Sequence, residues 1–196
     1  MSNSESGVVL TIGHSTRPVD EFIGLLKMNE VTMVVDIRTV PRSRHNPQFN
    51  KDVLPGELAG ADIGYMHMAG LGGLRHPGAH SVNSGWRNAS FRGFADYMQT
   101  KEFDAEIKRL IDLAHAEKIV LMCAEAVPWR CHRSLIADAL LIRGLSVEHI
   151  IGRGERRPHT RTPFAMVHGT MITYPSEEEH AGATGKASWS EDRIEG

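Results

Sequence analysis

The sequence predicts an α/β fold, a Rossmann-like three-layer sandwich in which helices cover both faces of a mostly parallel sheet of about five strands. Short runs of apolar and β-branched residues recur along the chain, as they do in buried strands. Segments with apolar residues at helical spacing alternate with these runs, and this alternation is typical of a parallel sheet. The predicted strands are residues 8–13, 32–37, 63–68, 118–122 and 146–152.

The first half of the chain contains three of these strands and one clear helix. VVLTIG is the first strand, and the turn GHSTRP follows it. A helix is expected to begin near Pro18, because proline favours the first helical position. Asp20 lies in its first turn, where the helix dipole favours an acid, and Phe22 begins its apolar face. TMVVDI and IGYMHM are the second and third strands.

The second half continues the alternation. FRGFADYM (91–98) and the segment 103–118 are predicted helices, the second with Ile107 and Leu110 at helical spacing. KIVLM is the fourth strand, a helix runs from about Leu135 to Gly144, and SVEHIIG is the fifth strand.

A change in composition after Gly152 predicts a domain of residues 1–152 and a C-terminal extension of residues 153–196. The segment RGERRPHTR is strongly basic, and residues 164–175 could form a small hairpin or pack on the domain. The last stretch, 176–196, is small, polar and acidic, so we expect it to be partly mobile.

The composition favours a cytoplasmic protein with reduced thiols. The formal net charge is −2, and two cysteines imply no disulfide framework. The polar start lacks a signal-peptide pattern, and no run approaches the ~18 apolar residues of a membrane helix. We therefore expect no membrane partner.

Chemically active residue types follow the predicted strands. Because the carboxyl ends of parallel strands share one edge of the sheet, these residues should gather where open α/β folds bind ligands. Arginines are frequent among them, and arginine binds phosphate or carboxylate through paired hydrogen bonds. An anionic ligand is the natural expectation, although single arginines often remain solvated or pair with acids. The candidates for substrate binding are Ser15, Asp36, Arg38, Arg42, Arg130, Arg133, Gly72 and Gly73.

Cys123 is the candidate nucleophile. It ends a strand before a loop and a helix, and nearby arginines and a helix N-terminus would favour its thiolate. Six residues separate it from Arg130, whereas phosphatase loops use five, and a packed strand-end cysteine is the simpler alternative. Glu125 and His132, or His14, are the candidates for moving protons.

A metal site is the second interpretation of the same loop. Cys123, Cys131 and His132, with His14 nearby in the fold, could hold zinc or iron. Their spacing matches no known zinc ribbon or knuckle.

The motifs TIGHST, VVDIRTVPRS, AGLGG and CAEAVPWRCHRSLIADAL together resemble the DUF488 family, over about residues 8–152. The most specific part is the pattern C-x-E followed by C-H-R, present here as Cys123, Glu125, Cys131, His132 and Arg133. The resemblance carries no established reaction. It implies that these residues form one site.

Three hypotheses for function follow. The first is an enzyme, a hydrolase or transferase with a cysteine thiolate, acting on an anionic, phosphate-bearing substrate such as a nucleotide or nucleic acid. The second is a zinc- or iron-binding protein. The third is a non-catalytic nucleic-acid-binding module that uses the arginine edge and the basic segment.

Overall fold

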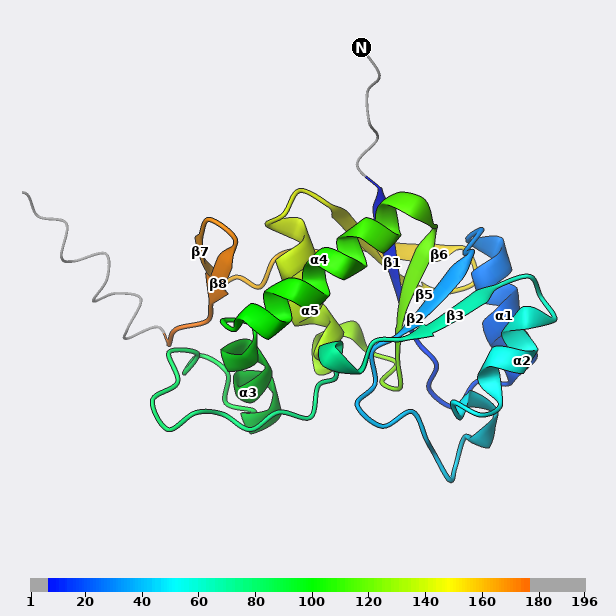
Figure 1. The fold of residues 1–196 in the computed structure, drawn as a ribbon, viewed down its shortest axis with the longest axis horizontal. Coiled ribbons are helices and arrows are strands. Elements are labelled where there is room, and N and C mark those ends of the chain that lie inside the picture. Colours follow the sequence, from blue (N-terminus) through cyan, green and yellow to red (C-terminus); the bar gives the residue numbers. More distant parts are fainter. Residues whose placement is uncertain (1–6, 177–196) are drawn as a thin grey trace, which may run out of the picture.

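A computed structural model describes residues 7–176, and a six-stranded sheet forms its centre (Figure 1). The strand order is β3-β2-β4-β1-β5-β6, in which β6 alone runs antiparallel to its neighbour. The strands are β1 (Val8–Gly13), β2 (Met33–Asp36), β3 (Gly64–His67), β4 (Ile119–Cys123), β5 (Ser146–Gly152) and β6 (Glu155–Pro158). The predicted α/β class and mostly parallel sheet are therefore confirmed.

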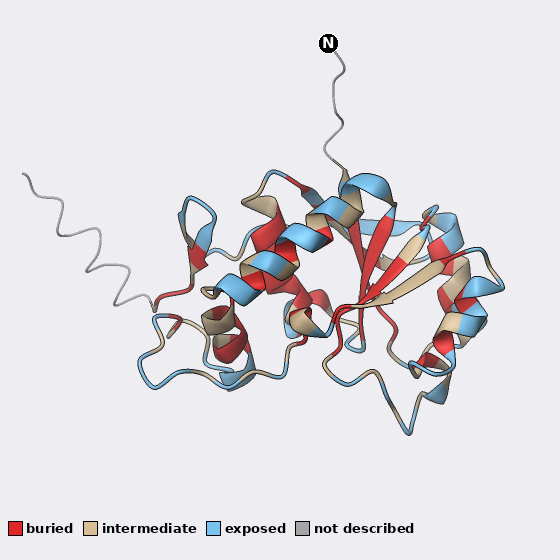
Figure 2. Cartoon of the chain, in the orientation of Figure 1, coloured by how far each residue is buried: buried red, intermediate tan, exposed pale blue. Residues whose placement is uncertain are grey.

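Helices cover both faces of the sheet. They are α1 (Val19–Met28), α2 (Leu54–Ala59), α3 (Ala89–Tyr97), α4 (Lys101–Ala116) and α5 (Arg133–Leu141). Successive strand side chains point to opposite faces, so Leu10 and Ile12 pack with α1 and α2, while Val9 packs with α4 and α5. The middle strands are almost wholly buried between these layers (Figure 2).

Capping residues explain where two helices begin. Asn88 accepts hydrogen bonds from the backbone amides of Ser90 and Phe91 at the start of α3. Thr100 accepts one from Phe103 at the start of α4. Both helices therefore begin two residues before the expected positions. Helix α2 was not predicted, because it is short and contains proline and glycine.

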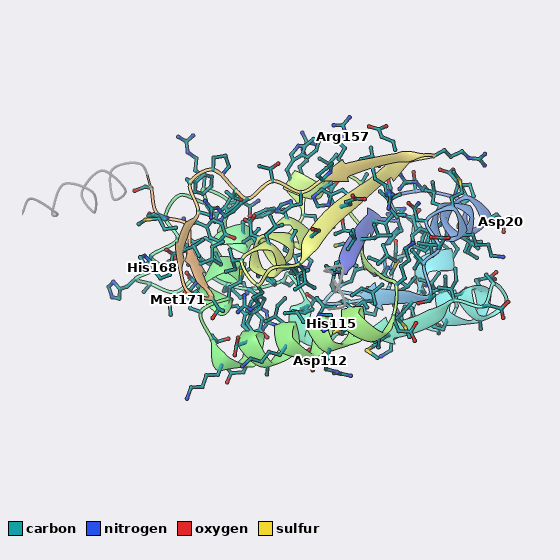
Figure 3. The ribbon with its side chains drawn as sticks, turned by 90° about the horizontal axis from the view of Figure 1, so that it is seen from above. Asp20, Asp112, His115, Arg157, His168 and Met171 are labelled. Carbon is teal, nitrogen blue, oxygen red and sulfur yellow. The ribbon has the colours of Figure 1, made fainter. Side chains whose placement is uncertain are left out.

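Residues 153–176 share the sheet and the core with the rest of the domain. The basic segment supplies β6, and the expected hairpin forms from β7 (Met166–His168) and β8 (Met171–Thr173). Ile172 and Tyr174 are buried in the main core. Seen from above, β6 with Arg157 lies along the side of the molecule opposite α4 with Asp112 and His115 (Figure 3). The expected mobile stretch beyond residue 176 lies outside the described residues.

A chain of buried polar groups joins this C-terminal segment to the domain. Thr11 Oγ1 lies 2.7 Å from His149 Nδ1, and His149 Nε2 lies 3.0 Å from His159 Nδ1. His159 Nε2 lies 2.8 Å from Asp138 Oδ1, and the Tyr174 hydroxyl donates to Asp138 Oδ2 at 2.9 Å. The groups connect β1, β5, α5 and the segments around β6 and β8. We call them the buried relay.

Within residues 7–176, no helix is long and apolar enough to cross a membrane.

Candidate active site

The loops that follow β1 and β4 meet at the carboxyl edge of the sheet. The backbone amide of His14 donates to the Cys123 carbonyl at 2.9 Å, and that of Ser15 donates to Ala124 at 2.9 Å. Gly13 makes this approach possible, because a Cβ atom there would lie 1.9 Å from the Glu125 carbonyl oxygen. The glycine of the G-H-S turn therefore brings β1 against the loop that carries the candidate nucleophile.

Cys123, Cys131 and His132 form one compact cluster, which we call the thiol cluster. Their sulfur atoms and a ring nitrogen of His132 all lie within 4.8 Å of one another. Cys123 comes from the end of β4, and the other two residues directly precede α5. Both cysteines are buried and free.

Hydrogen bonding fixes the tautomer of His132. Its Nε2 lies 3.2 Å from the Ile37 carbonyl oxygen, which can only accept, so Nε2 carries the proton. In the neutral ring, Nδ1 then presents a lone pair toward Cys131 Sγ, 3.7 Å away. Gly73 packs against the same ring, and a Cβ atom there would lie 2.4 Å from Nδ1.

The two thiols are not equivalent. A hydrogen bond from the Cys131 thiol lowers the pKa of Cys123 well below its usual value, and His132 and the Glu125 backbone amide lower it further, against the effect of burial. The same hydrogen bond and burial raise the pKa of Cys131. Cys123 is therefore the thiol that ionises first.

Arg133 braces the loop between the two cysteines. Its side chain is buried, and its guanidinium donates to the carbonyl oxygens of Glu125 and, at 2.7 Å, of Ala126. This position differs from the substrate-binding one expected for Arg133, because the guanidinium faces backbone carbonyls. The brace leaves Glu125 exposed, with Oε1 accepting from the Val127 amide at 3.1 Å.

A second polar group surrounds Arg38. Its guanidinium pairs with Asp36 at 2.6 and 2.9 Å and donates to the Phe49 carbonyl at 2.7 Å. Nη1 lies 3.1 Å from His14 Nε2, and the Tyr65 hydroxyl donates to Asp36 at 2.7 Å. Among the described residues, these contacts use four of the five guanidinium N–H groups, which leaves one on Nη1 for a ligand.

His14 is held from both sides of its ring. Nδ1 donates to the Ser15 carbonyl oxygen at 2.8 Å, so Nε2 accepts from Arg38. The ring stacks on Phe49 at 4.2 Å between centroids, and burial lowers the pKa of His14. The geometry therefore gives this neutral imidazole the role of orienting Arg38.

Two adjoining cavities open over these groups and form one groove. The first, of about 380 Å³, is lined by the thiol cluster, Gly73 and Arg130. The second, of about 290 Å³, is lined by His14, Ser15 and Arg42. Both cavities are lined by Arg38, Val40, Ala124 and Glu125.

A family model for DUF488, a domain of unknown function, matches residues 18–140, which is more than half of the chain. The chain belongs to the DUF488 family. Neither the curated proteins nor the solved structures contain a match to it. The DUF488 match includes the thiol cluster, Asp36 and Arg38, whereas the G-H-S turn lies before its first residue.

In this DUF488 chain, most of the residues expected to form the site lie around the groove. Three of the expected ligand-binding residues do not line it: Asp36 is fully buried beneath Arg38, Gly72 packs on Thr39, and Arg133 faces backbone carbonyls. Sequence reasoning missed Tyr65 and Phe49, which hold Asp36, Arg38 and His14 in place. Tyr65 has one available signal, since it is a polar-tipped residue in the predicted strand that follows the one containing Asp36.

Proposed function

We propose that the protein is an enzyme that acts on an anionic, phosphate-bearing substrate, a nucleotide or nucleic acid, with the Cys123 thiolate as nucleophile. One observation carries the proposal. The more acidic of two adjacent thiols lines the same groove as Arg38, Arg42 and Arg130. A hydrolase or transferase of this kind needs a nucleophile and cationic side chains that contact the same substrate. Residues of both kinds line the groove.

The anion would bind along the groove rather than at one point. Arg130 lines the first cavity and Arg42 the second, and both are exposed and have no ion pair among the described residues. Arg38 contributes its remaining Nη1 hydrogen at the centre of the groove. Asp36, Tyr65 and His14 keep that guanidinium in place.

Glu125 is the best-placed proton carrier, because it lines both cavities and is solvent-accessible. In the proposed step, the Cys123 sulfur bonds to the electrophilic centre. The bond to the leaving oxygen breaks with its electron pair, and Glu125, acting as general acid, supplies that oxygen with a proton. Water or an acceptor hydroxyl then attacks, gives its proton to Glu125, and releases the Cys123 thiolate.

The test is a screen of nucleotides and phosphorylated compounds, followed by Cys123→Ser and Glu125→Gln variants. We expect turnover to fall by about 10²-fold or more in each, the usual scale for a lost nucleophile or acid–base group. Glu57→Gln is the matched control, because Glu57 is exposed and lies on α2. Unchanged turnover in the Cys123 variant would contradict the mechanism.

The role of the arginines in substrate binding can be tested with one variant and one control in the same loop. Arg42→Gln should raise KM, because Arg42 lines the groove, whereas Arg44→Gln should not, because Arg44 is exposed in the same loop and lines neither cavity. Salt-sensitive binding of DNA or RNA that survives loss of Cys123 and Glu125 would instead favour a binding module.

A metal site is the second candidate, and the orientation of His132 favours it. The ring donates its Nε2 proton to the Ile37 carbonyl, which is how metal-binding histidines are commonly oriented, and Nδ1 faces the two sulfurs. Two cysteines and one histidine beside a cavity suit a zinc ion with an open position. Metal analysis of reduced protein with a thiol titration separates the candidates. Stoichiometric zinc or iron with protected thiols would identify Cys123 as a ligand.

A further inference from the structure

We infer that Cys123 and Cys131 are a site of reversible oxidation, at which a hydroperoxide converts the two thiols into an intramolecular disulfide. The inference rests on the Cys123 nucleophile of the proposed function. It gives Cys131 a role of its own, as the thiol that resolves the oxidised form of Cys123.

The geometry of the loop favours a bond between these two residues. The sulfur atoms lie within 4.8 Å of each other, and the loop that joins the residues is closed by its own contacts. Arg133 holds the carbonyls of Glu125 and Ala126, and the Cys131 amide donates to Pro128 at 3.0 Å. The two sulfur atoms therefore have to approach by less than about 3 Å to form an S–S bond of about 2.05 Å.

Access to the sulfur atoms is narrow. Cys123 is 8% exposed and Cys131 is 4% exposed, yet both line the first cavity. A molecule of the size of hydrogen peroxide can enter a cavity of about 380 Å³, whereas the thiol of a second protein cannot easily approach a buried sulfur. The arrangement favours a bond within the chain over one between chains.

The chemistry takes two steps. The Cys123 thiolate attacks one peroxide oxygen, the O–O bond breaks, and the departing oxygen takes a proton and leaves as an alcohol or as water, so that Cys123 becomes a sulfenic acid. The Cys131 sulfur then attacks the Cys123 sulfur, and the S–O bond breaks. His132 Nδ1, 3.7 Å from Cys131 Sγ, can relay the Cys131 proton to the departing hydroxide, which leaves as water. The peroxide gains two electrons and the two thiols lose them.

The oxidised form would lack both the nucleophile and two of the possible metal ligands. Because the partner thiol is already in place, the sulfenic acid would be resolved before a second peroxide oxidised it irreversibly. The disulfide would thus abolish the activity of the groove reversibly and protect Cys123 from irreversible oxidation.

The inference is tested on the full chain without any substrate. The protein is treated with a chelator, then with hydrogen peroxide, and is then analysed by peptide mapping. Trypsin cleaves after Arg130, between the two cysteines. We expect peptides 119–130 and 131–133 to appear as one linked species that separates on reduction with dithiothreitol. Over-oxidised Cys123 beside a free Cys131, or a link between two chains, would overturn the inference.

Two variants sharpen the result, each with its fold checked by circular dichroism. In Cys131→Ser, Cys123 should give a sulfenic acid that dimedone traps, and excess peroxide should then cause a loss of thiol that dithiothreitol does not reverse. In Cys123→Ser, Cys131 should stay reduced at the same peroxide dose. Rapid alkylation of Cys123 without any linked peptide would defeat the inference and leave the proposed function standing. A Cys123 that reacts with neither reagent would count against both.

Discussion

His132 shows how hydrogen bonding and packing can fix the orientation of a single side chain in a site. The Ile37 carbonyl fixes one ring nitrogen, the Cys131 sulfur faces the other, and Phe94 packs edge-on at 5.0 Å between centroids. Gly73 closes the remaining side. The ring therefore has little freedom to rotate, and the lone pair on Nδ1 stays directed at the thiols, where the metal proposal and the relay of the Cys131 proton need it.

Gly73→Ala should disturb this arrangement. The added Cβ atom would meet the His132 ring at 2.4 Å, so the ring must leave its hydrogen bond with Ile37 or push into the sulfur atoms. Because His132 helps to lower the pKa of Cys123, we expect alkylation of Cys123 by iodoacetamide at neutral pH to be slower in the variant than in the native chain.

Gly78→Ala is the matched control, since a Cβ atom there meets only Asp96 Oδ2 at 3.7 Å, an ordinary contact. Equal alkylation rates in the two variants would show that the ring of His132 does not govern the thiol.

The sequence identifies the arginines near the site but does not predict which groups their side chains contact. Arg42, Arg130 and Arg133 all follow predicted strands, and a sequence cannot separate a guanidinium that faces a cavity from one that faces carbonyl groups. Arg133 is 1% exposed, whereas the other two are open to solvent. The distinction depends on how the loop folds back over α5, which is a tertiary property.

At the scale of elements, the loop between β4 and α5 is the part that the site depends on most. It carries the nucleophile at one end, the resolving thiol at the other, and Glu125 between them. Contacts from two other parts of the chain keep it in one conformation. The β1 turn donates backbone hydrogen bonds to its start, and Arg133 holds its middle.

Arg133→Met should remove the brace while keeping much of the side-chain volume. The carbonyls of Glu125 and Ala126 would lose charge-assisted partners, so we expect the free energy of unfolding to fall by about 2–4 kcal/mol. Urea unfolding followed by circular dichroism measures it. Arg130→Met, at an exposed position in the same loop, should change it by less than about 0.5 kcal/mol. A similar, small change in both variants would mean that Arg133 does not brace the loop.

Elements with a strong local signal could be predicted, and those set by tertiary contacts could not. The five parallel strands follow from apolar runs, and the hairpin of β7 and β8 is one of the two arrangements that residues 164–175 left open. Helix α2 and strand β6 have no such signal. The four residues of β6 are exposed and include arginines, so they form a strand only because β5 offers an edge.

At the scale of the whole molecule, the groove depends on groups buried deep in the domain. Thr11 of the buried relay lies two residues before Gly13, and Asp138 lies on α5, the helix that begins beside the thiol cluster. The relay also reaches the segment beyond residue 152, which composition alone sets apart from the domain. Sequence reasoning could not find the relay, because its five members are scattered over the chain and each is unremarkable where it occurs.

The relay predicts how stability depends on pH. Burial, with smaller effects from His159 and Arg133, lowers the pKa of His149 to about 3, whereas the unfolded chain has the ordinary value of 6.5. Below pH 6.5 the unfolded state binds a proton at this position that the folded state does not, so acid favours unfolding. The contribution of His149 is complete above pH 6.5 and is lost as the pH falls toward 3.

His149→Gln removes this titration while offering other hydrogen bonds to Thr11 and His159. Urea unfolding at several pH values between 7 and 5 should therefore show a shallower decline in the free energy of unfolding for the variant than for the native chain. The difference in slope should approach about 1.4 kcal/mol per pH unit, the limit for one proton. His168→Gln, which removes an exposed imidazole on the β7–β8 hairpin, should keep the native slope. If the native chain and both variants decline in parallel, His149 binds its proton equally in the folded and unfolded states, and the relay does not hold it neutral.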